Sequence, residues 1–293
     1  MNDTSLSSVL ALSGSERLQG LMAFSDGILE DTDAGQAPDH EVVKETVQAL
    51  IDVVVSGEGG GRLRLAVGEL LGRLGDPRLR APEDEDYWVP VHIKLGSLLV
   101  GRHLVTISEW QGFVADGGYK DDSLWDEAGK AWRDSVARLW PALAARDEVR
   151  SLLVPNQPVV GVSWHEACAY ARKHEGRLLS FDERMQVCRG QEKRPYPWGA
   201  PFGHGNANTR EEVLGKPCAV GLYLGDVTPE GVCDLAGNVA EWTKDAIDEQ
   251  VVIHPGSWEQ PSMAAWAKAR SLEPARTRGA DLGFRLARNA ESD

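Results

Sequence analysis

The residue types most able to do chemistry lie close together in residues 231–242. This segment reads Gly-Val-Cys-Asp-Leu-Ala-Gly-Asn-Val-Ala-Glu-Trp. Gly237 and Asn238 tolerate a positive φ, so the chain can turn sharply there and leave several backbone carbonyls pointing inward. Asp234 and Glu241 lie on either side of this turn, and carboxylates next to free carbonyls are the oxygen ligands that calcium binds. The segment therefore predicts a hard-cation site.

Two interpretations of this turn follow from the residues alone. In the first, calcium binds the side chains of Asp234 and Glu241 and the backbone oxygens of Gly237 and Val239. In the second, the same residues form an ordinary turn whose two acids are solvated. The spacing within one segment does not choose between these interpretations.

Composition and charge describe a folded, acidic protein. The chain has 293 residues, of which 42% are hydrophobic, enough for one large domain and a smaller one. Its 31 basic and 45 acidic residues give a net charge of −14, which repels phosphate backbones, so we expect no nucleic-acid partner. No stretch has the pattern of a targeting signal or a membrane span, so we expect a cytoplasmic protein without membrane contact.

Helical periodicity dominates residues 1–80. Apolar residues recur at helical spacing from His40 to Val54 and again from Arg62 to Leu74, and residues 15–29 are expected to form another helix. The helix pair resembles a single HEAT-type repeat. Since one repeat cannot bury its own apolar face, we expect it to pack on the next domain or on a partner.

Strand and helix patterns alternate after the acidic run Glu83–Asp86, which we interpret as a solvated boundary. Ser163 and Ser180 are suitable caps for two of the helices. The tryptophans at 125, 132 and 140 are expected to pack in the core. The predicted elements are two strands, Trp88–Ile93 and Leu98–Val105, and three helices, Glu109–Ala115, 164–174 and Phe181–Arg189.

The segment 231–242 resembles the G-[LV]-x-[DN]-[LMV]-x-G-N-[VA]-x-E-W signature of the formylglycine-generating enzyme (sulfatase-modifying factor) family. Other stretches agree with the family in the same order: Pro158–Trp164, Gly176–Leu179, Tyr196–Gly199, Gly256–Trp258 and Leu282–Arg285. The resemblance implies an α+β domain of the C-type-lectin-like fold over residues 85–293, with much irregular structure, preceded by the small helical HEAT-like segment.

The resemblance also implies metal ligands. It assigns a structural calcium ion to Asp234, Gly237, Val239 and Glu241, and it places Asn208 in a second calcium site. Family members usually have Leu-Pro-Thr-Glu-x-Glu-Trp where this chain has Leu-Leu-Ser-Phe-Asp-Glu-Arg, ending at Arg184. The helix is still expected there, with a changed surface.

The oxidases of the family have two copper-binding cysteines in the pattern G-S-x-x-C-x-x-x-x-C, and this chain lacks both. Gln260 and Ala265 occupy the two positions, and neither side chain offers an anionic sulfur to copper. Formylglycine generation by that mechanism is therefore excluded. The four cysteines of the chain form no CxxC pair, and we expect mostly buried thiols at Cys168, Cys188, Cys218 and Cys233.

Histidines offer no alternative metal site by their spacing. The candidates show neither an i,i+4 pair nor a His-x-His motif: His165, His174, His204 and His254. A related iron-dependent branch of the family carries a separate histidine-rich helical domain, whereas residues 1–80 contain only His40, so its chemistry is not expected here. GxSxG, P-loop and HExxH motifs are also missing.

We therefore predict a binding module with a protein partner. Some family members diversify the segment between Trp258 and Leu282 by retroelement-templated mutagenesis, and the flanking scaffold is intact here. The predicted binding residues are Glu259, Gln260, Met263, Trp266, Lys268, Arg276 and Arg278. Two alternatives stay open: Met263 and Trp266 belong to the core, or the chain is a metal-dependent oxidase or other enzyme of the same fold with an unrecognised active site.

Overall fold

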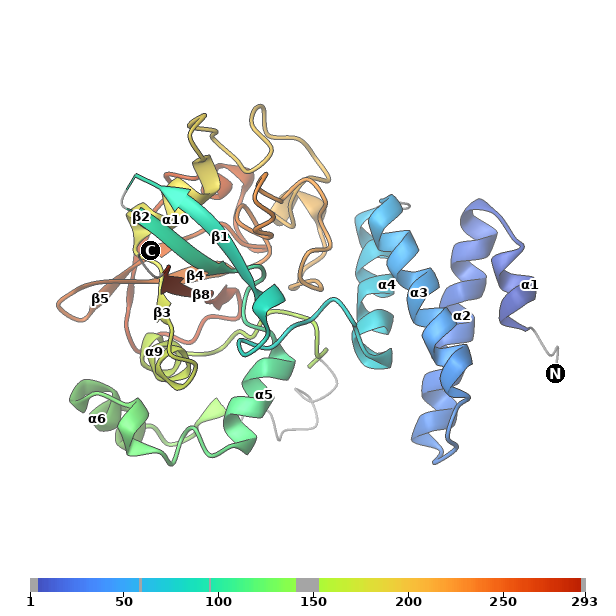
Figure 1. Cartoon of the computed structure of the whole chain (residues 1–293), viewed down its shortest axis with the longest axis horizontal. Helices are drawn as coiled ribbons and strands as arrows, with labels where there is room; N and C mark the ends of the chain where they lie inside the picture. Colours follow the sequence, from blue (N-terminus) through green and yellow to red (C-terminus); the bar gives the residue numbers. More distant parts are fainter. Residues whose placement is uncertain (1–4, 58–59, 95, 141–152, 291–293) are drawn as a thin grey trace.

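The computed structural model describes residues 5–57, 60–94, 96–140 and 153–290. Figure 1 shows a group of helices at one end of the molecule and a larger body of strands, helices and long loops at the other. The chain between them, residues 75–84, is an irregular connection with turns at residues 77–78 and 82–83. Mixed α and β structure in the larger body agrees with the predicted class.

The N-terminal group consists of helices with polar caps and apolar inner faces. Asp39 caps α3 by accepting hydrogen bonds from the backbone N–H groups of Glu41 and Val42, and Gly57 ends this helix with a φ of 68°. All three predicted helices are present, while the short α1 was not predicted. The bounds are α1 Leu6–Leu10, α2 Gly14–Asp33, α3 His40–Ser56 and α4 Gly61–Leu74. The HEAT likeness stays a prediction.

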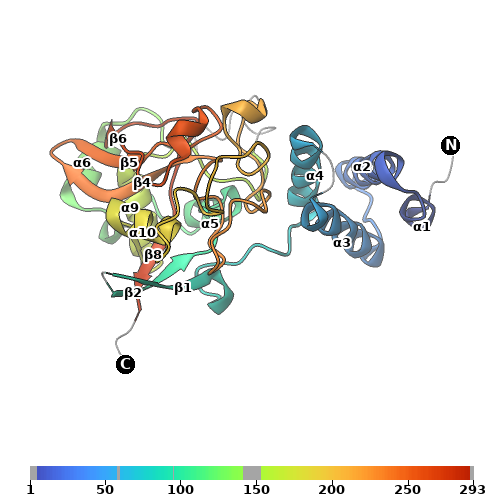
Figure 2. The same ribbon diagram turned by 90° about the horizontal axis from the view of Figure 1, so that it is seen from above.

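Helix α4 packs on the larger body, as Figures 1 and 2 both show. Leu65 and Leu71 of α4 share one buried apolar cluster with Leu222 and Tyr223. The side chain of Asn156 donates a hydrogen bond to the carbonyl of Gly68, at 3.0 Å. The unburied apolar face expected from the sequence is thus covered by the following domain.

The strands of the larger body form two four-stranded sheets within the described residues. The first sheet has the order β1-β2-β8-β3, with β1 Trp88–Ile93, β2 Gly96–Gly101, β8 Leu286–Asn289 and β3 Arg177–Leu178. The second has the order β6-β5-β4-β7, with β6 Ser271–Pro274, β5 Gln250–His254, β4 Ala240–Ile247 and β7 Leu282–Gly283. The pairing of β4 with β7 is parallel.

The second predicted strand was placed too far along the chain. It was expected to reach Val105, but β2 ends at Gly101, which pairs with Trp88, the first residue of β1. Beyond this residue the backbone leaves the sheet, and the N–H of Val105 donates to the carbonyl of Phe284 instead. Strand β2 ends at Gly101 because its antiparallel partner β1 offers no residue beyond Trp88 to pair with.

Three helices of the larger body start with a complete capping box. In each of them the N-cap side chain accepts a hydrogen bond from the backbone N–H three residues later, and the glutamate at that later position accepts one from the backbone N–H of the N-cap residue. The N-cap residues are Thr106, Ser163 and Ser180. The helix bounds are α5 Ile107–Ala115, α6 Glu127–Ser135, α9 Trp164–Lys173 and α10 Phe181–Arg189. Short 3-10 turns lie at Glu85–Tyr87, Asp122–Leu124, Arg210–Glu212 and Ser262–Ala265.

An aromatic core holds these elements together. Trp110 of α5 is fully buried, stacks on Tyr170 of α9 at 5.6 Å, and meets Phe284 edge-on at 6.0 Å. Trp125 and Trp140 are buried in the same cluster, as predicted. Within the described residues, no helix combines the length and apolar character that crossing a bilayer requires.

Candidate functional site

The turn at residues 234–241 is buried and tightly packed. Asn238 adopts a φ of 70° and Asp234 a φ of 56°, so both take the left-handed conformation. Gly237 is required for a different reason than the one predicted. A β-carbon at this position would lie 2.6 Å from the backbone oxygen of Asn208, so only glycine allows the two chain segments to approach.

Asp226 organises the backbone of this turn, and the sequence did not single it out. Its carboxylate accepts hydrogen bonds from the backbone N–H groups of Leu235, Ala236 and Gly237, at 3.0–3.1 Å. Burial, and then the nearby charge of Asp234, raise the pKa of Asp226 to about 7. The sequence feature that could have identified Asp226 is its position as an acidic residue in the loop just before residues 231–242.

Glu241 is buried between two arginines. Its Oε1 accepts from the Nε and Nη2 atoms of Arg184, at 3.1 and 2.7 Å, and its Oε2 accepts from Nε of Arg285, at 3.2 Å. All three side chains are at most 2% exposed. Burial alone would raise the pKa of Glu241, but the two guanidinium charges outweigh it and hold the pKa below its ordinary value.

The same two guanidinium groups also bind carbonyls of the turn. Arg184 donates to the backbone oxygen of Leu235 at 2.7 Å, and Arg285 donates to those of Cys233 and Asp234 at 2.7 and 3.3 Å. Oδ2 of Asp234 accepts from the backbone N–H of Gly221. This arrangement does not fit the calcium ion that the resemblance implies, since both oxygens of Glu241 already bind cationic groups. The described residues also contain no cluster of three or more His, Cys, Asp or Glu side chains suited to a metal ion.

Asn208 presents a different environment. Its Nδ2 donates to the backbone oxygen of Lys216 at 3.1 Å, while its Oδ1 is buried and has no hydrogen-bond partner within the described part of the chain. An unpaired buried oxygen is compatible with a cation ligand. The second calcium site therefore stays a prediction.

The two positions of the missing oxidase cysteines lie in different surroundings. Gln260 is half-buried and lines a cavity of about 200 Å³ together with Glu273 and Asp281. Ala265 is fully buried, in a small apolar cluster with Ala207 and Ala236. Neither position offers a thiolate or another soft ligand.

The four cysteines that the chain does have are free thiols. Three of them are buried and Cys168 is half-buried, as predicted. Burial raises the pKa of the Cys168, Cys188 and Cys233 thiols to about 12, so these groups stay protonated at neutral pH. They are unsuited to activate oxygen.

The predicted binding segment exposes two large apolar side chains. Met263 is 76% exposed and Trp266 is 45% exposed, and the ammonium group of Lys268 lies over the Trp266 ring at 5.9 Å. Glu259 and Arg276 are exposed as well. The alternative that Met263 and Trp266 belong to the core is therefore wrong.

Arg278 does not belong to this exposed set. Its guanidinium forms a salt bridge with the fully buried Glu166 at 3.1 Å and lies over the ring of Trp132 at 4.8 Å. Its side chain is only 17% exposed. The prediction that Arg278 contacts a partner is corrected here: its charge neutralises Glu166, which also accepts a hydrogen bond from Tyr119.

The histidines are dispersed, as their spacing indicated. His254 is fully buried, and burial followed by the charge of Arg184 lowers its pKa to about 3, so its ring is neutral. His165 packs against Trp132 at 5.6 Å between ring centroids. His204 is exposed. None of these arrangements resembles a metal centre.

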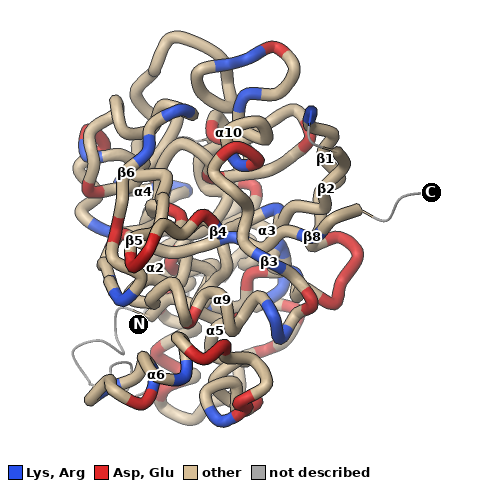
Figure 3. The backbone as a smooth tube through the Cα atoms, turned by 90° about the vertical axis from the view of Figure 1, so that its left-hand side faces the viewer, with Lys and Arg blue, Asp and Glu red and all other residues tan. Residues whose placement is uncertain are grey.

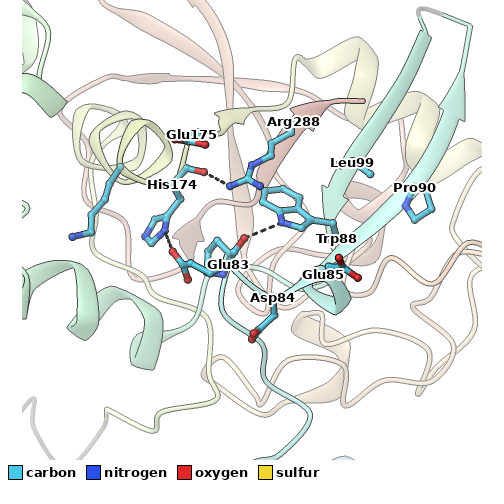
Figure 4. A pocket seen from close by; sticks show the side chains of 11 residues that line it. Glu83, Asp84, Glu85, Trp88, Pro90, Leu99, His174, Glu175 and Arg288 are labelled. Atoms are coloured by element: carbon cyan, nitrogen blue, oxygen red, sulfur yellow. Dashed lines mark hydrogen bonds and ion pairs between the residues drawn. The ribbon is translucent and has the colours of Figure 1, made fainter. Parts of the chain in front are cut away.

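A cavity of about 750 Å³ opens where the acidic run meets β1 and the end of α9 (Figure 4). Nδ1 of His174 lies 2.8 Å from Glu83, and the guanidinium of Arg288 covers the ring of Trp88 at 4.3 Å. The sequence predicted only a solvated boundary at residues 83–86. Figure 4 marks contacts of His174 with Glu83 and of Arg288 with the carbonyl of His174, whereas Asp84, Glu85 and Glu175 carry no dashed line. Since acidic and basic side chains line the cavity together, it shows no single ligand chemistry.

Charge is mixed over the molecule. Figure 3 shows Lys and Arg interspersed with Asp and Glu along the chain, without one continuous basic face in this view. The absence of a nucleic-acid partner stays an expectation that rests on the net charge of −14.

A family model described as the sulfatase-modifying factor enzyme 1-like domain matches residues 61–290. The chain belongs to this family. The match begins at the first residue of α4, the helix that packs on the larger body. The resemblance recognised in the 231–242 signature is thereby confirmed.

Relatives of the sulfatase-modifying factor domain with known names include enzymes. Hercynine oxygenase of Mycolicibacterium thermoresistibile is 32% identical over 171 residues, which cover 54% of this chain and 38% of the relative. The formylglycine-generating enzyme of Thermomonospora curvata is 29% identical, over 56% of this chain and 64% of the relative. The structure of PvdO from Pseudomonas aeruginosa is 23% identical with a TM-score of 0.52, covering 66% of this chain and 81% of that one, which shows the shared fold.

The chain spans only 38–43% of the length of the three hercynine oxygenases that it matches. More than half of each hercynine oxygenase therefore lies outside the part that aligns with this chain. An activity of the whole relative does not follow for this chain from the shared domain.

Proposed function

We propose that this chain is a non-catalytic protein-binding module of the sulfatase-modifying factor family. Its binding surface is formed by residues 258–282 and centred on Met263 and Trp266. The observation that carries the proposal is the exposure of these two side chains, 76% and 45%. Large apolar side chains exposed together are costly in water and are typical of protein interfaces, where tryptophan and methionine are enriched.

The backbone of this segment is held firmly by the rest of the domain, which supports its use as a surface. The N–H of Ala267 donates to the carbonyl of Pro195, and the N–H of Arg210 donates to the carbonyl of Gln260. Ser257 donates to Asp281 at 2.7 Å. A rigid backbone lowers the entropy lost on binding, so the exposed side chains are presented in a preorganised form.

Site-specific photo-crosslinking tests the proposal in cells of the source organism. A photoreactive amino acid at position 263 is compared with the same residue at position 247, because Ile247 is 61% exposed but lies outside the segment. We expect a discrete protein adduct from position 263 that is missing from position 247. Identical adducts from both positions, or none from position 263, would refute the proposal.

An enzyme on the same fold is the second candidate. It is supported by the named relatives, which are hercynine oxygenases and formylglycine-generating enzymes. Such an activity would need a redox metal held by residues other than Gln260 and Ala265, since neither side chain is a soft ligand. Stoichiometric copper or iron in the purified protein would favour this candidate over the binding module.

A further inference from the structure

We propose that the guanidinium group of Arg184, next to that of Arg285, takes the place of a structural cation in the 234–241 turn, so that this domain holds its signature turn without calcium. Arg285 lies in the Leu282–Arg285 stretch that agrees with the family pattern. Arg184 is the decisive residue, because it stands where family members usually have tryptophan in the Leu-Pro-Thr-Glu-x-Glu-Trp pattern. This helix position therefore carries a positive charge, and its side chain reaches Glu241 at 2.7 Å.

The geometry resembles what a cation would provide. A hard cation in such a turn binds a carboxylate and several carbonyl oxygens at once. Here the two guanidinium groups together bind both oxygens of Glu241 and the carbonyls of Cys233, Asp234 and Leu235. The donors come from α10 and from the residue before β8, so the contacts join distant segments around the turn.

Burial keeps water from replacing the arginine contacts of Glu241. Since Glu241 and both guanidinium groups are at most 2% exposed, water does not compensate for a lost partner. A calcium ion would have to displace at least one arginine from Glu241, and that arginine would then be a buried, unpaired charge. Calcium binding is therefore disfavoured for two reasons: it would leave a buried arginine charge unpaired, and both oxygens of Glu241 already accept hydrogen bonds from the arginines.

Thermal unfolding with and without calcium tests the proposal on the full chain. Replacing chelator with millimolar calcium is expected to change the Tm of the wild type and of Glu241→Gln by the same amount, because the 234–241 turn needs no calcium and any effect at Asn208 is common to both. Arg184→Met removes one partner of a buried carboxylate, so its Tm should fall by roughly 10 °C. Arg184→Lys should fall less, because an ammonium group keeps the charge but cannot bind Glu241 and Leu235 with the same planar fork.

Controls make the outcome decisive even if one variant fails to fold. Arg62→Met at an exposed position of α4 should leave the Tm unchanged. A rise of the wild-type Tm with calcium that Glu241→Gln abolishes would overturn the proposal, and so would a wild-type Tm in Arg184→Met. Since neither measurement involves residues 258–282, the result is independent of the proposed binding function.

Discussion

Arg184, Glu241 and Arg285 form a buried ion cluster whose members come from three separate parts of the sequence. The sequence located the turn and both of its acids, Asp234 and Glu241, because they lie within one segment. It could not show the arginines, since these are 57 residues before and 44 residues after Glu241 along the chain. Contacts over such separations depend on the packing of α10 and β7 against β4, which local periodicity does not encode.

Trp266 provides a residue-level prediction for the binding surface. Truncating a central interface tryptophan typically costs about 2 kcal/mol or more of binding free energy. Trp266→Ala should therefore lower the affinity for the partner identified by crosslinking roughly thirtyfold. Since the ring is 45% exposed, the Tm should change little. Binding is measured by titration with the identified partner, and Ile247→Ala is the matched exposed control. Unchanged affinity in Trp266→Ala would place the interface elsewhere.

Glu109 makes the stability of the domain depend on pH. Burial is the main reason that its pKa is raised from 4.5 to about 7, although hydrogen bonds from Thr106 oppose the shift. A raised pKa in the folded state means that its contribution is fully present below pH 4.5 and is lost as the pH rises through 7. The free energy of unfolding should therefore fall over this range by about 3 kcal/mol from this residue.

The variant Glu109→Gln isolates this effect, because glutamine at the third helical position preserves the capping box with Thr106. Urea unfolding at pH 5 and pH 7.5 should show a smaller decrease in the variant than in the wild type. Glu16→Gln, at an exposed site in the first turn of α2, is the control and should keep the wild-type decrease. Equal pH dependence of wild type and Glu109→Gln would contradict the account.

At the level of elements, the sequence predicted those features whose interacting residues lie within a few positions of one another. The capping boxes at Ser163 and Ser180 were visible as a polar residue followed three positions later by a glutamate. The end of β2 was not visible, because it depends on where its antiparallel partner β1 begins. Arg278 was assigned to the surface for the same reason: its partner Glu166 lies in a different helix.

Gly72 lets α4 approach the larger body closely, which gives a prediction at this level. A β-carbon there would lie 2.8 Å from Cγ1 of Val154 and would also overlap the side chain of Asn156. Gly72→Ala should therefore destabilise the protein by roughly 1–3 kcal/mol, although alanine favours helices. Gly27→Ala in α2 is the matched control, because nothing lies within 4 Å of its added carbon. Chemical denaturation measures both, and a stabilised Gly72→Ala would be the contrary result.

For the whole molecule, the shared cluster of α4 with Leu222 and Tyr223 predicts the pattern of limited proteolysis. The exposed connection between α2 and α3, residues 34–39, should be cut first. Residues 61–290 should then remain in one fragment, as mass spectrometry can establish. Release of a stable fragment that begins after residue 80 and lacks α4 would show that the helix docks only weakly.

At two of the three places where the family resemblance implies a metal ion, this chain has side chains that do not suit that ion. Gln260 and Ala265 stand at the copper-ligand positions, and Arg184 reaches the carboxylate of Glu241. Gln260 and Ala265 offer copper no soft ligand, and Arg184 occupies the carboxylate that calcium would bind.

Elemental analysis of the purified full-length chain, expressed with copper, iron and calcium supplied, tests this claim most directly. We predict that copper and iron are each well below one equivalent per chain after gel filtration, in a protein that is folded and still forms its crosslink through position 263. One equivalent of copper or iron would contradict the account and make the enzyme the better interpretation of this fold.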